Sequence, residues 1–542
     1  MIVHPAHWRC AQLAAIRFCV TLAALALAAA GATAATAAAA AASGSGSGPI
    51  VTTDDGAVRG MTAGTVDEFL GIPYAAPPTG NLRWRPPQPP AEWQGVRDAT
   101  QFAPSCPQPP SPFAPSGPFS EDCLYLNVYT PVPHTGDEDG LPVLVWIHGG
   151  GLTEEGSRNY DGAKLAADGT VVVTINYRLG ALGFLAHPAL ASRPGGPAGN
   201  YGLMDQQAAL RWVQDNISQF GGDPHNVAIA GQSAGGLSVL AQLVSVGARG
   251  LFQRAIIQSG TFALNQQPLA TAEATGEAFA AQAGCPDQTA ACLRHLPVAN
   301  LVTPNFVEIP GVVDGKVLTE PIGTALAAGQ FARVPVLNGT NHDEERLFVD
   351  GLHLTVSGGT FVPIPYEPVT TDNYQANIAA VLGVSAERAA AIAAEYPPGA
   401  YPDAALSTLV SDTNFACPAL QVDQSTAQRV PTFAYEFNDD NAPPPYTPPG
   451  FLTVATHESE LPYLFDLPNA PYPPTLNPDQ QTLAASMRAA WANFAATGNP
   501  ATAAVPWPAF GGSAQMLSLV PPQPQLETDF AARHHCAFWA AG

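Results

Sequence analysis

The chain has 542 residues, of which 46% are hydrophobic and only 12% are charged, so it has ample material for a core and too little charge for an intrinsically disordered protein. Its 44 acidic residues outnumber its 21 basic ones and give a formal net charge of -23, which disfavours nucleic acid and anionic membrane surfaces as partners. No low-complexity linker divides the middle of the sequence, which favours one large domain.

The N-terminus has the pattern of a secretory signal peptide. Arg9 and Arg17 precede an apolar run at residues 18–30, and small residues follow it, so we assign residues 1–34 to the signal. The run is too short to cross about 30 Å of hydrocarbon comfortably, which argues against stable membrane insertion. Residues 35–49 continue as Ala, Ser and Gly and are expected to be disordered or removed, leaving a single domain at 50–542. This pattern predicts a secreted or periplasmic protein.

Six cysteines remain after the two in the signal segment. In an oxidising compartment such residues form disulfides, and six of them permit 15 connectivities. They are Cys106, Cys123, Cys285, Cys292, Cys417 and Cys536.

Short apolar runs separated by helical stretches predict an α/β fold with a mainly parallel central sheet flanked by helices. The clearest helix is expected at residues 205–220, where apolar residues recur on one face, and another at 237–243. Functional groups of such sheets gather at the carboxyl ends of the strands. The predicted strands are 143–147, 171–175, 227–230, 255–257, 334–337 and 433–437.

A GxSxG motif at residues 231–235 gives the strongest chemical signal. It lies directly after the predicted strand 227–230 and before a predicted helix, the context in which a sharp turn exposes a serine hydroxyl. Glycines on both sides fit because a side chain there would collide with the neighbouring backbone. Ser233 is therefore predicted to be a nucleophile rather than an ordinary turn serine.

A serine nucleophile needs backbone donors for the oxyanion that forms on the acyl group. The sequence His-Gly-Gly-Gly at residues 148–151 follows the predicted strand 143–147 and offers such donors. We expect an oxyanion hole formed by the amides of Gly150, Gly151 and Ala234. The alternative is a plain glycine turn.

These motifs resemble those of type-B carboxylesterases, the family that includes cholinesterases, bile-salt lipases and bacterial para-nitrobenzyl esterases. The resemblance spans about residues 50–540 and implies the α/β-hydrolase fold with Pro-rich loop insertions. It rests on FGGDPHNVAIAGQSAG at 220–235, EDCLYLNV at 121–128, FLGIPYA at 69–75, NYRLG at 176–180, GNYGLMDQ at 199–206 and CAFW at 536–539.

The resemblance also implies a catalytic acid and base in the order Ser, Glu, His. NGTNHDE at 338–344 resembles the family's acid segment and implies Glu344, with Asp343 and Glu345 as rivals. THESELPY at 456–463 resembles the segment that carries the base and implies His457. Among the other histidines, His342 is a weak rival, and His148 is expected to help set the glycine loop.

Three disulfides are implied by the same family, Cys106 with Cys123, Cys285 with Cys292 and Cys417 with Cys536. Three departures are visible: Gln232 stands where many relatives have Glu, which speaks against specialisation for cationic esters, and Glu345 and Glu458 occupy positions that are often Gly. None removes a catalytic group.

The expected function is two-step hydrolysis of small-molecule carboxylic esters by a serine carboxylesterase, with no cofactor and no metal. One alternative is a lipase or a specialised hydrolase of long-chain or polymeric esters. An alternative of another class is a non-catalytic adhesion or binding protein of the same fold. Acyl length, alcohol preference and oligomeric state do not follow from the sequence.

Overall fold

The computed structural model describes residues 48–132, 140–191, 198–302, 311–357, 360–446, 454–512 and 514–541. The predicted signal segment 1–34 and nearly all of the predicted disordered segment 35–49 lie outside the described residues, so both stay predictions. The described residues belong to one compact unit, Ser47–Gly542.

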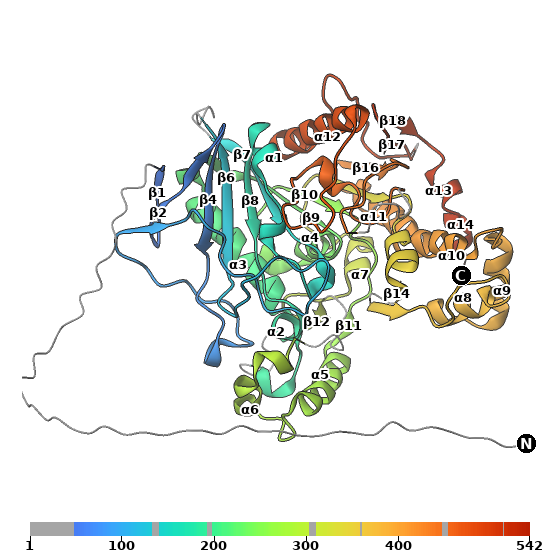
Figure 1. Cartoon of the computed structure of the whole chain (residues 1–542), viewed down its shortest axis with the longest axis horizontal. Helices are drawn as coiled ribbons and strands as arrows, with labels where there is room; N and C mark the ends of the chain where they lie inside the picture. The colour runs from blue at the N-terminus through green and yellow to red at the C-terminus, as the bar shows by residue number, and fades with distance from the viewer. Residues whose placement is uncertain are drawn as a thin grey trace, which may run out of the picture. The chain divides into compact units, whose positions relative to one another are not determined.

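A large mixed sheet forms the centre of this unit (Figure 1). Pairs of neighbouring strands are parallel from β17 through β8 and antiparallel at both ends of the sheet, which confirms the predicted mainly parallel α/β architecture. In spatial order the strands among the described residues are β18 (Gln525–Glu527), β17 (Met516–Leu519), β16 (Thr432–Phe437), β13 (Val336–Asn341), β10 (Arg254–Gln258), β9 (Gly222–Gln232), β7 (Leu141–Ile147), β8 (Val171–Ile175), β6 (Tyr125–Pro131), β4 (Val66–Pro73) and β3 (Met61–Ala63).

Three smaller sheets accompany the large one among the described residues. One joins β1 (Ile50–Thr53), β2 (Gly56–Arg59) and β5 (Val96–Asp98), another pairs β11 (Gln267–Pro268) with β12 (Val312–Val313), and the third pairs β14 (Leu354–Ser357) with β15 (Thr360–Pro363).

Helices cover both faces of the large sheet and are joined to the strands by irregular loops. The helices are α1 (Ala163–Ala167), α2 (Gly180–Phe184), α3 (Tyr201–Asn216), α4 (Ala234–Val244), α5 (Leu269–Ala283), α6 (Ala290–His295), α7 (Ile322–Ala327), α8 (Tyr374–Leu382), α9 (Ala386–Glu395), α10 (Pro402–Ser411), α11 (Cys417–Ala427), α12 (Pro478–Thr497), α13 (Phe530–Arg533) and α14 (Cys536–Ala540).

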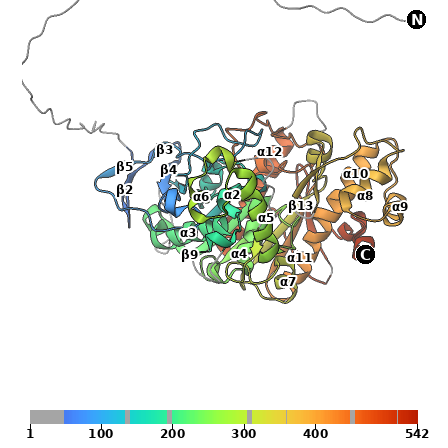
Figure 2. The same ribbon diagram turned by 90° about the horizontal axis from the view of Figure 1, so that it is seen from below.

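Strand β7 shows why helices must cover both faces of the central sheet. Successive side chains of a strand point to opposite faces, and here both faces are apolar. Val143, Val145 and Ile147 pack in the core that holds residues of α3 and α4, whereas Leu144 and Trp146 pack in the core that holds residues of α1 and α12. Figure 2 shows α3 and α4 on one side of the sheet and α12 on the other.

All six predicted strands are confirmed, as β7, β8, β9, β10, β13 and β16, and both predicted helices are confirmed as α3 and α4. Helix α12, the longest described helix, was not predicted from the sequence. It begins with a capping box in which the side chains and backbones of Asn477 and Gln480 bond reciprocally. Leu483, Met487 and Trp491 then recur every four residues and are buried against the sheet.

Three disulfides join the described cysteines, and the presence of disulfide bonds is thereby confirmed. They pair Cys106 with Cys123, Cys285 with Cys292 and Cys417 with Cys536.

Among the described residues, no single helix combines the length and apolar character needed to cross a membrane. Helices α8 and α9 meet that requirement only when taken together, as a pair bent by 115°.

Candidate active site

Ser233 occupies a sharp turn between β9 and α4. Its backbone angles, φ 57° and ψ -125°, are strained for a residue with a side chain, as is typical of the serine in a sharp turn from strand to helix. Both flanking glycines are needed. A methyl group on Gly231 would lie 2.5 Å from the carbonyl carbon of Gly235, and one on Gly235 would lie 2.0 Å from the carbonyl oxygen of Ile147.

The sheet brings three loops of this region together. β7 and β9 are parallel neighbours with Ile147 opposite Gly231, so the glycine loop leaves the sheet next to the nucleophile turn. β10 joins β9 to β13, with Gln258 opposite both Gln232 and Gly339. The segment that carries Glu344 therefore leaves the same edge of the sheet.

The glycine loop lies against Ser233. A methyl group on Gly149 would be 3.1 Å from the Cβ of Ser233. Gly150 and Gly151 follow with φ values of 76° and 60°, a region that favours glycine. Ala234 is the first residue of α4 and is buried, and its amide belongs to the set of N-terminal N–H groups that a helix leaves without an internal partner.

Glu344 lies just past β13 and is completely buried. Its Oε1 accepts hydrogen bonds from the hydroxyl of Thr340 at 2.7 Å and from the amide of Asn341 at 2.8 Å. Its Oε2 is 2.5 Å from Nδ1 of His457, which donates to it. The carboxylate is thus fixed by two local donors and holds one nitrogen of the imidazole.

The two rival acids have other partners. Asp343 bonds to the ring of its neighbour His342 at 3.0 Å. Glu345 is buried, and its carboxylate accepts from Thr355 and Asn414, each at 3.1 Å. Of the three adjacent acids, Glu344 alone bonds to His457 among the described residues.

Backbone pairing explains how His457 reaches an acid that is 113 residues away in the sequence. Asp343 and Thr456 form an isolated parallel bridge, and the amide of His457 donates to the carbonyl of Glu344 at 3.2 Å. The side-chain amide of Asn341 also donates to the carbonyl of Thr456 at 2.7 Å. Backbone pairing and the bond from Asn341 therefore hold the two segments side by side, in addition to the bond between the side chains of Glu344 and His457.

The second nitrogen of the imidazole points toward the nucleophile turn. Nε2 of His457 lies 3.2 Å from Nε2 of Gln232, whose amide donates to it. The hydroxyl of Ser233, on the next residue, forms no hydrogen bond with another described residue. In many enzymes the bond between nucleophile and base tightens only when substrate is bound.

Charged neighbours favour the protonated form of the His457 imidazole. Burial lowers the pKa of His457, but the carboxylates of Glu344, Glu460 and Glu345 together raise the pKa above its ordinary value, and Glu344 contributes most to the rise. Phe348 and Phe415 flank the ring, with centroids at 5.0 and 5.4 Å. These two aromatic residues were not predicted from the sequence, because neither belongs to a motif.

The two rival histidines lie elsewhere. His148 is buried and stacked on Tyr177 with ring centroids 4.4 Å apart, and burial lowers its pKa to about 3, so its ring is neutral. His342 bonds to Asp343 and lies beside the ring of His534. Neither bonds to Ser233 or Glu344 among the described residues.

Two buried glutamates close to the site were not predicted as functional residues. Glu155 follows the glycine loop and Glu458 follows His457, with φ values of 75° and 71° and exposures of 0% and 3%. Burial is the main cause that raises the pKa of Glu155 to about 8 and the pKa of Glu458 well above its usual range. The identity of Glu458 in place of Gly was the signal visible in the sequence.

Two groups among the described residues have metal-ligand composition. Cys285 and Cys292 are joined in a disulfide, which removes both thiolates from the first group. In the second, the two ring nitrogens of His534 bond to Asp412 at 2.5 Å and to Glu436 at 2.6 Å. Burial lowers the pKa of His534, but the carboxylates raise it to about 9, so this group is a buried ion network around an imidazolium.

Comparisons of this chain with a family model, with known sequences and with solved structures agree with one another. A sequence model of the carboxylesterase family matches residues 47–539. Pyrethroid hydrolase Ces2e from Rattus norvegicus is 37% identical, over 87% of this chain and 86% of its own. Fumonisin B1 esterase from Sphingopyxis macrogoltabida is also 37% identical, over 83% and 82%. A solved structure of PNB esterase superposes with a TM-score of 0.74 at 33% identity, covering 90% of this chain and 98% of that one.

Proposed function

The chain belongs to the carboxylesterase family and is a carboxylic ester hydrolase, and from this premise we propose that Ser233, His457 and Glu344 are its catalytic triad. The amides of Gly150, Gly151 and Ala234 form the oxyanion hole. The single observation that carries the proposal is the buried bond between Nδ1 of His457 and Glu344, which leaves Nε2 directed at the nucleophile turn.

In the first step, Nε2 of His457 takes the proton of the Ser233 hydroxyl while the oxygen attacks the ester carbonyl. The carbonyl oxygen becomes an oxyanion, and the three amides stabilise it. When the tetrahedral intermediate collapses, the bond to the alcohol oxygen breaks and His457 returns the proton to the leaving alcohol. An acyl group stays on Ser233.

In the second step, His457 takes a proton from water, and the hydroxide attacks the acyl carbonyl. Collapse of this intermediate breaks the bond to Ser233, which regains its proton, and a carboxylic acid leaves. Glu344 orients the imidazole and stabilises its positive charge in both steps. Its two further donors, Thr340 and the amide of Asn341, keep the carboxylate in place.

The resting arrangement requires one exchange of partners. Nε2 of His457 accepts a hydrogen bond from Gln232 and must accept from Ser233 instead. The two donors belong to adjacent residues, one at the end of β9 and the other at the start of α4. Substrate entering the site supplies the carbonyl carbon toward which the hydroxyl turns.

Small-molecule carboxylic esters are the substrate class of this family, and within that class we propose a preference for neutral esters. Gln232 carries no charge beside the nucleophile, which removes an attraction for cationic alcohols. Nitrophenyl esters of graded acyl length, assayed on wild type and on Ser233→Ala, test the proposal. Hydrolysis should fall at least a thousandfold in Ser233→Ala for every ester. Undiminished hydrolysis in that variant would contradict it.

We also propose that the protein is exported. The three disulfides support this, because such bonds persist in oxidising compartments and are rare in the cytosol. Expression of the full chain followed by N-terminal sequencing of the secreted product tests the idea. A protein that stays in the cytoplasm with its first residues intact would contradict it.

A further inference from the structure

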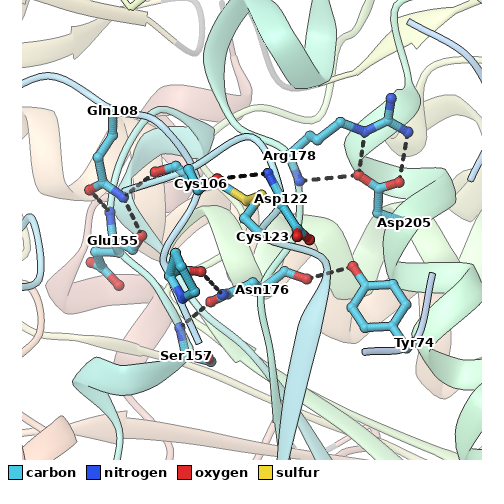
Figure 3. Close-up of a disulfide and its surroundings, with 12 residues drawn as sticks. Tyr74, Cys106, Gln108, Asp122, Cys123, Glu155, Ser157, Asn176, Arg178 and Asp205 are labelled. Carbon is cyan, nitrogen blue, oxygen red and sulfur yellow. Dashed lines mark hydrogen bonds and ion pairs between the residues drawn. A yellow bond between two sulfur atoms is a disulfide. The ribbon is translucent and has the colours of Figure 1, made fainter. Parts of the chain in front are cut away.

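We infer that Gln108 is a positioning residue for the oxyanion hole, acting through the backbone of Glu155. This inference rests on the proposed function, because it assigns a role in holding Gly150 and Gly151. Gln108 stands in the loop closed by the disulfide between Cys106 and Cys123, whereas the glycine loop lies more than forty residues further along the chain. Figure 3 shows the two segments side by side.

Gln108 binds both polar backbone groups of Glu155. Its Oε1 accepts from the amide of Glu155 at 2.8 Å, and its Nε2 donates to the carbonyl of the same residue at 2.7 Å. The same Nε2 donates to the carbonyl of Cys106 at 3.0 Å. Gln108 is only 7% exposed, so no water competes freely for these bonds. A primary amide is the side chain that offers a donor and an acceptor at this spacing.

The backbone of Glu155 needs these two hydrogen bonds because its conformation is left-handed. Its φ is 75°, a conformation that residues with a Cβ rarely adopt without support from their surroundings. Three observations point to Gln108 as that support: the two bonds, the burial of both residues, and the disulfide that ties Gln108 to the body of the protein.

The conformation of Glu155 bears directly on Gly150. The carbonyl of Gly150 accepts from the amides of Thr153 at 2.9 Å and Glu154 at 3.0 Å, so the loop closes into a tight turn. Glu155 then folds back over that turn. A methyl group on Gly150 would lie 2.9 Å from Cγ of Glu155, and the carboxyl group of Glu155 accepts from the hydroxyl of Tyr160 at 2.6 Å. Rotation of the Glu155 backbone would therefore move the turn that carries Gly150.

A second link holds the same arm of the loop. The amide of Ser157 donates to Oδ1 of Asn176 at 2.9 Å, and Nδ2 of Asn176 donates to the carbonyl of Pro104 at 3.2 Å. Both anchors, Gln108 and Asn176, thus connect residues 155–157 to residues 104–108 (Figure 3). Gln108 is the anchor nearer to the glycines, and its loss should act on catalysis more than on substrate binding.

Gln108→Met tests the inference, because it keeps the size of the side chain and removes both bonds. We expect kcat on a short-chain nitrophenyl ester to fall by about 10- to 100-fold, with KM within about threefold of wild type. Gln88→Met is the matched control, since the side chain of Gln88 is exposed and, among the described residues, bonds only to the carbonyls of Pro86 and Pro87. A change in kcat below twofold in Gln108→Met would overturn the inference.

Inhibitor binding separates a positioning role from general loosening of the fold. A trifluoromethyl ketone forms an oxyanion when Ser233 adds to it, whereas the unfluorinated ketone binds largely as an intact carbonyl. Affinity for the fluorinated compound should fall by the same factor as kcat, with affinity for the other compound unchanged. Equal loss for both ketones would indicate only structural damage and would overturn the inference.

A double substitution tests whether the effect passes through Glu155. Glycine adopts positive φ without strain, so in a Glu155→Gly background the Gln108→Met substitution should lower kcat by no more than about threefold. A loss of the full size in that background would overturn the inference. If Gln108→Met does not fold, Gln108→Glu replaces it, because a carboxylate keeps the bond to the Glu155 amide and loses the bond to its carbonyl.

A wrong catalytic triad would give a different experimental result from a wrong role for Gln108. Ser233→Ala is assayed in parallel, and hydrolysis at the wild-type rate in that variant would refute the triad whatever the Gln108 variants do. A Gln108 result is interpreted only where Ser233→Ala is inactive.

Discussion

Replacing Glu155 by Gln should stabilise the protein increasingly as the pH rises. Glu155 is completely buried beside the glycine loop, and burial raises its pKa from 4.5 to about 8. A carboxyl group whose pKa is higher in the folded state than in the unfolded state stabilises the fold fully below pH 4.5. That stabilisation is lost as the pH rises through about 8. The difference corresponds to about 5 kcal/mol.

This free energy converts into a measurable change in melting temperature. Unfolding entropy scales with chain length, so a protein of 542 residues shifts by about 1 °C for each 1 kcal/mol. Glutamine keeps an oxygen that can accept from Tyr160 and has no charge to bury. The Tm of Glu155→Gln minus that of wild type should rise from near zero at pH 4.5 to about 5 °C at pH 9.

Differential scanning fluorimetry across this pH range measures the two curves directly. Glu277→Gln serves as control, because the side chain of Glu277 is exposed on α5 and its replacement should leave Tm unchanged at every pH. A difference between Glu155→Gln and wild type that stays flat from pH 4.5 to 9 would refute the reasoning. It would mean that burial does not hold the carboxyl group of Glu155 in its protonated form.

Two other substitutions close to His457 have defined outcomes. Gln232→Met removes a donor that favours the neutral imidazole, so the acid limb of the pH profile of kcat/KM should move to higher pH by about 0.7 units. An acid limb that is unchanged or moves to lower pH would contradict the hydrogen bond from Gln232 to His457. Glu458→Gly relieves a backbone φ of 71° and removes a buried carboxyl group, so Tm at neutral pH should rise by at least about 1 °C. A lower Tm in that variant would show that the carboxyl group of Glu458 stabilises the fold.

The nucleophile turn could be predicted from sequence because all its determinants are local. An apolar strand, two glycines in contact with backbone and an apolar helix follow one another within about twenty residues, and each has its own pattern. The glycine loop could be predicted in the same way, since it follows a run of apolar residues that form a buried strand. Parallel pairing of β7 and β9 then dictates that the two loops meet.

The meeting of Glu344 and His457 could not be derived from periodicity. It depends on an isolated bridge between Asp343 and Thr456, which lie in irregular loops, and on a bond from Asn341, the last residue of β13. Their identification relied on resemblance to a family. The predicted strand at 334–337 also ended too early, because β13 extends to Asn341 through polar residues that are buried and hydrogen-bonded.

The two hydrogen bonds between Gln108 and the backbone of Glu155 could not be predicted from the sequence. Gln108 lies 47 positions from its partner in a Pro-rich loop, where no pattern distinguishes it from other polar residues. The positive φ of Glu155 could not be predicted either, because the strain exists only once the surrounding structure imposes it. Such contacts follow from the folded loops and not from local preference.

The most direct test of the triad is covalent labelling with a nitrophenyl phosphonate. Attack by the serine oxygen forms a bond to phosphorus and releases nitrophenolate, and mass spectrometry of the digested protein locates the modified residue. We expect one phosphonyl group per chain, on the peptide that contains Ser233, with labelling about a thousandfold slower in His457→Ala. Label on another residue, or an unmodified Ser233 in enzyme that the reagent has fully inactivated, would contradict it.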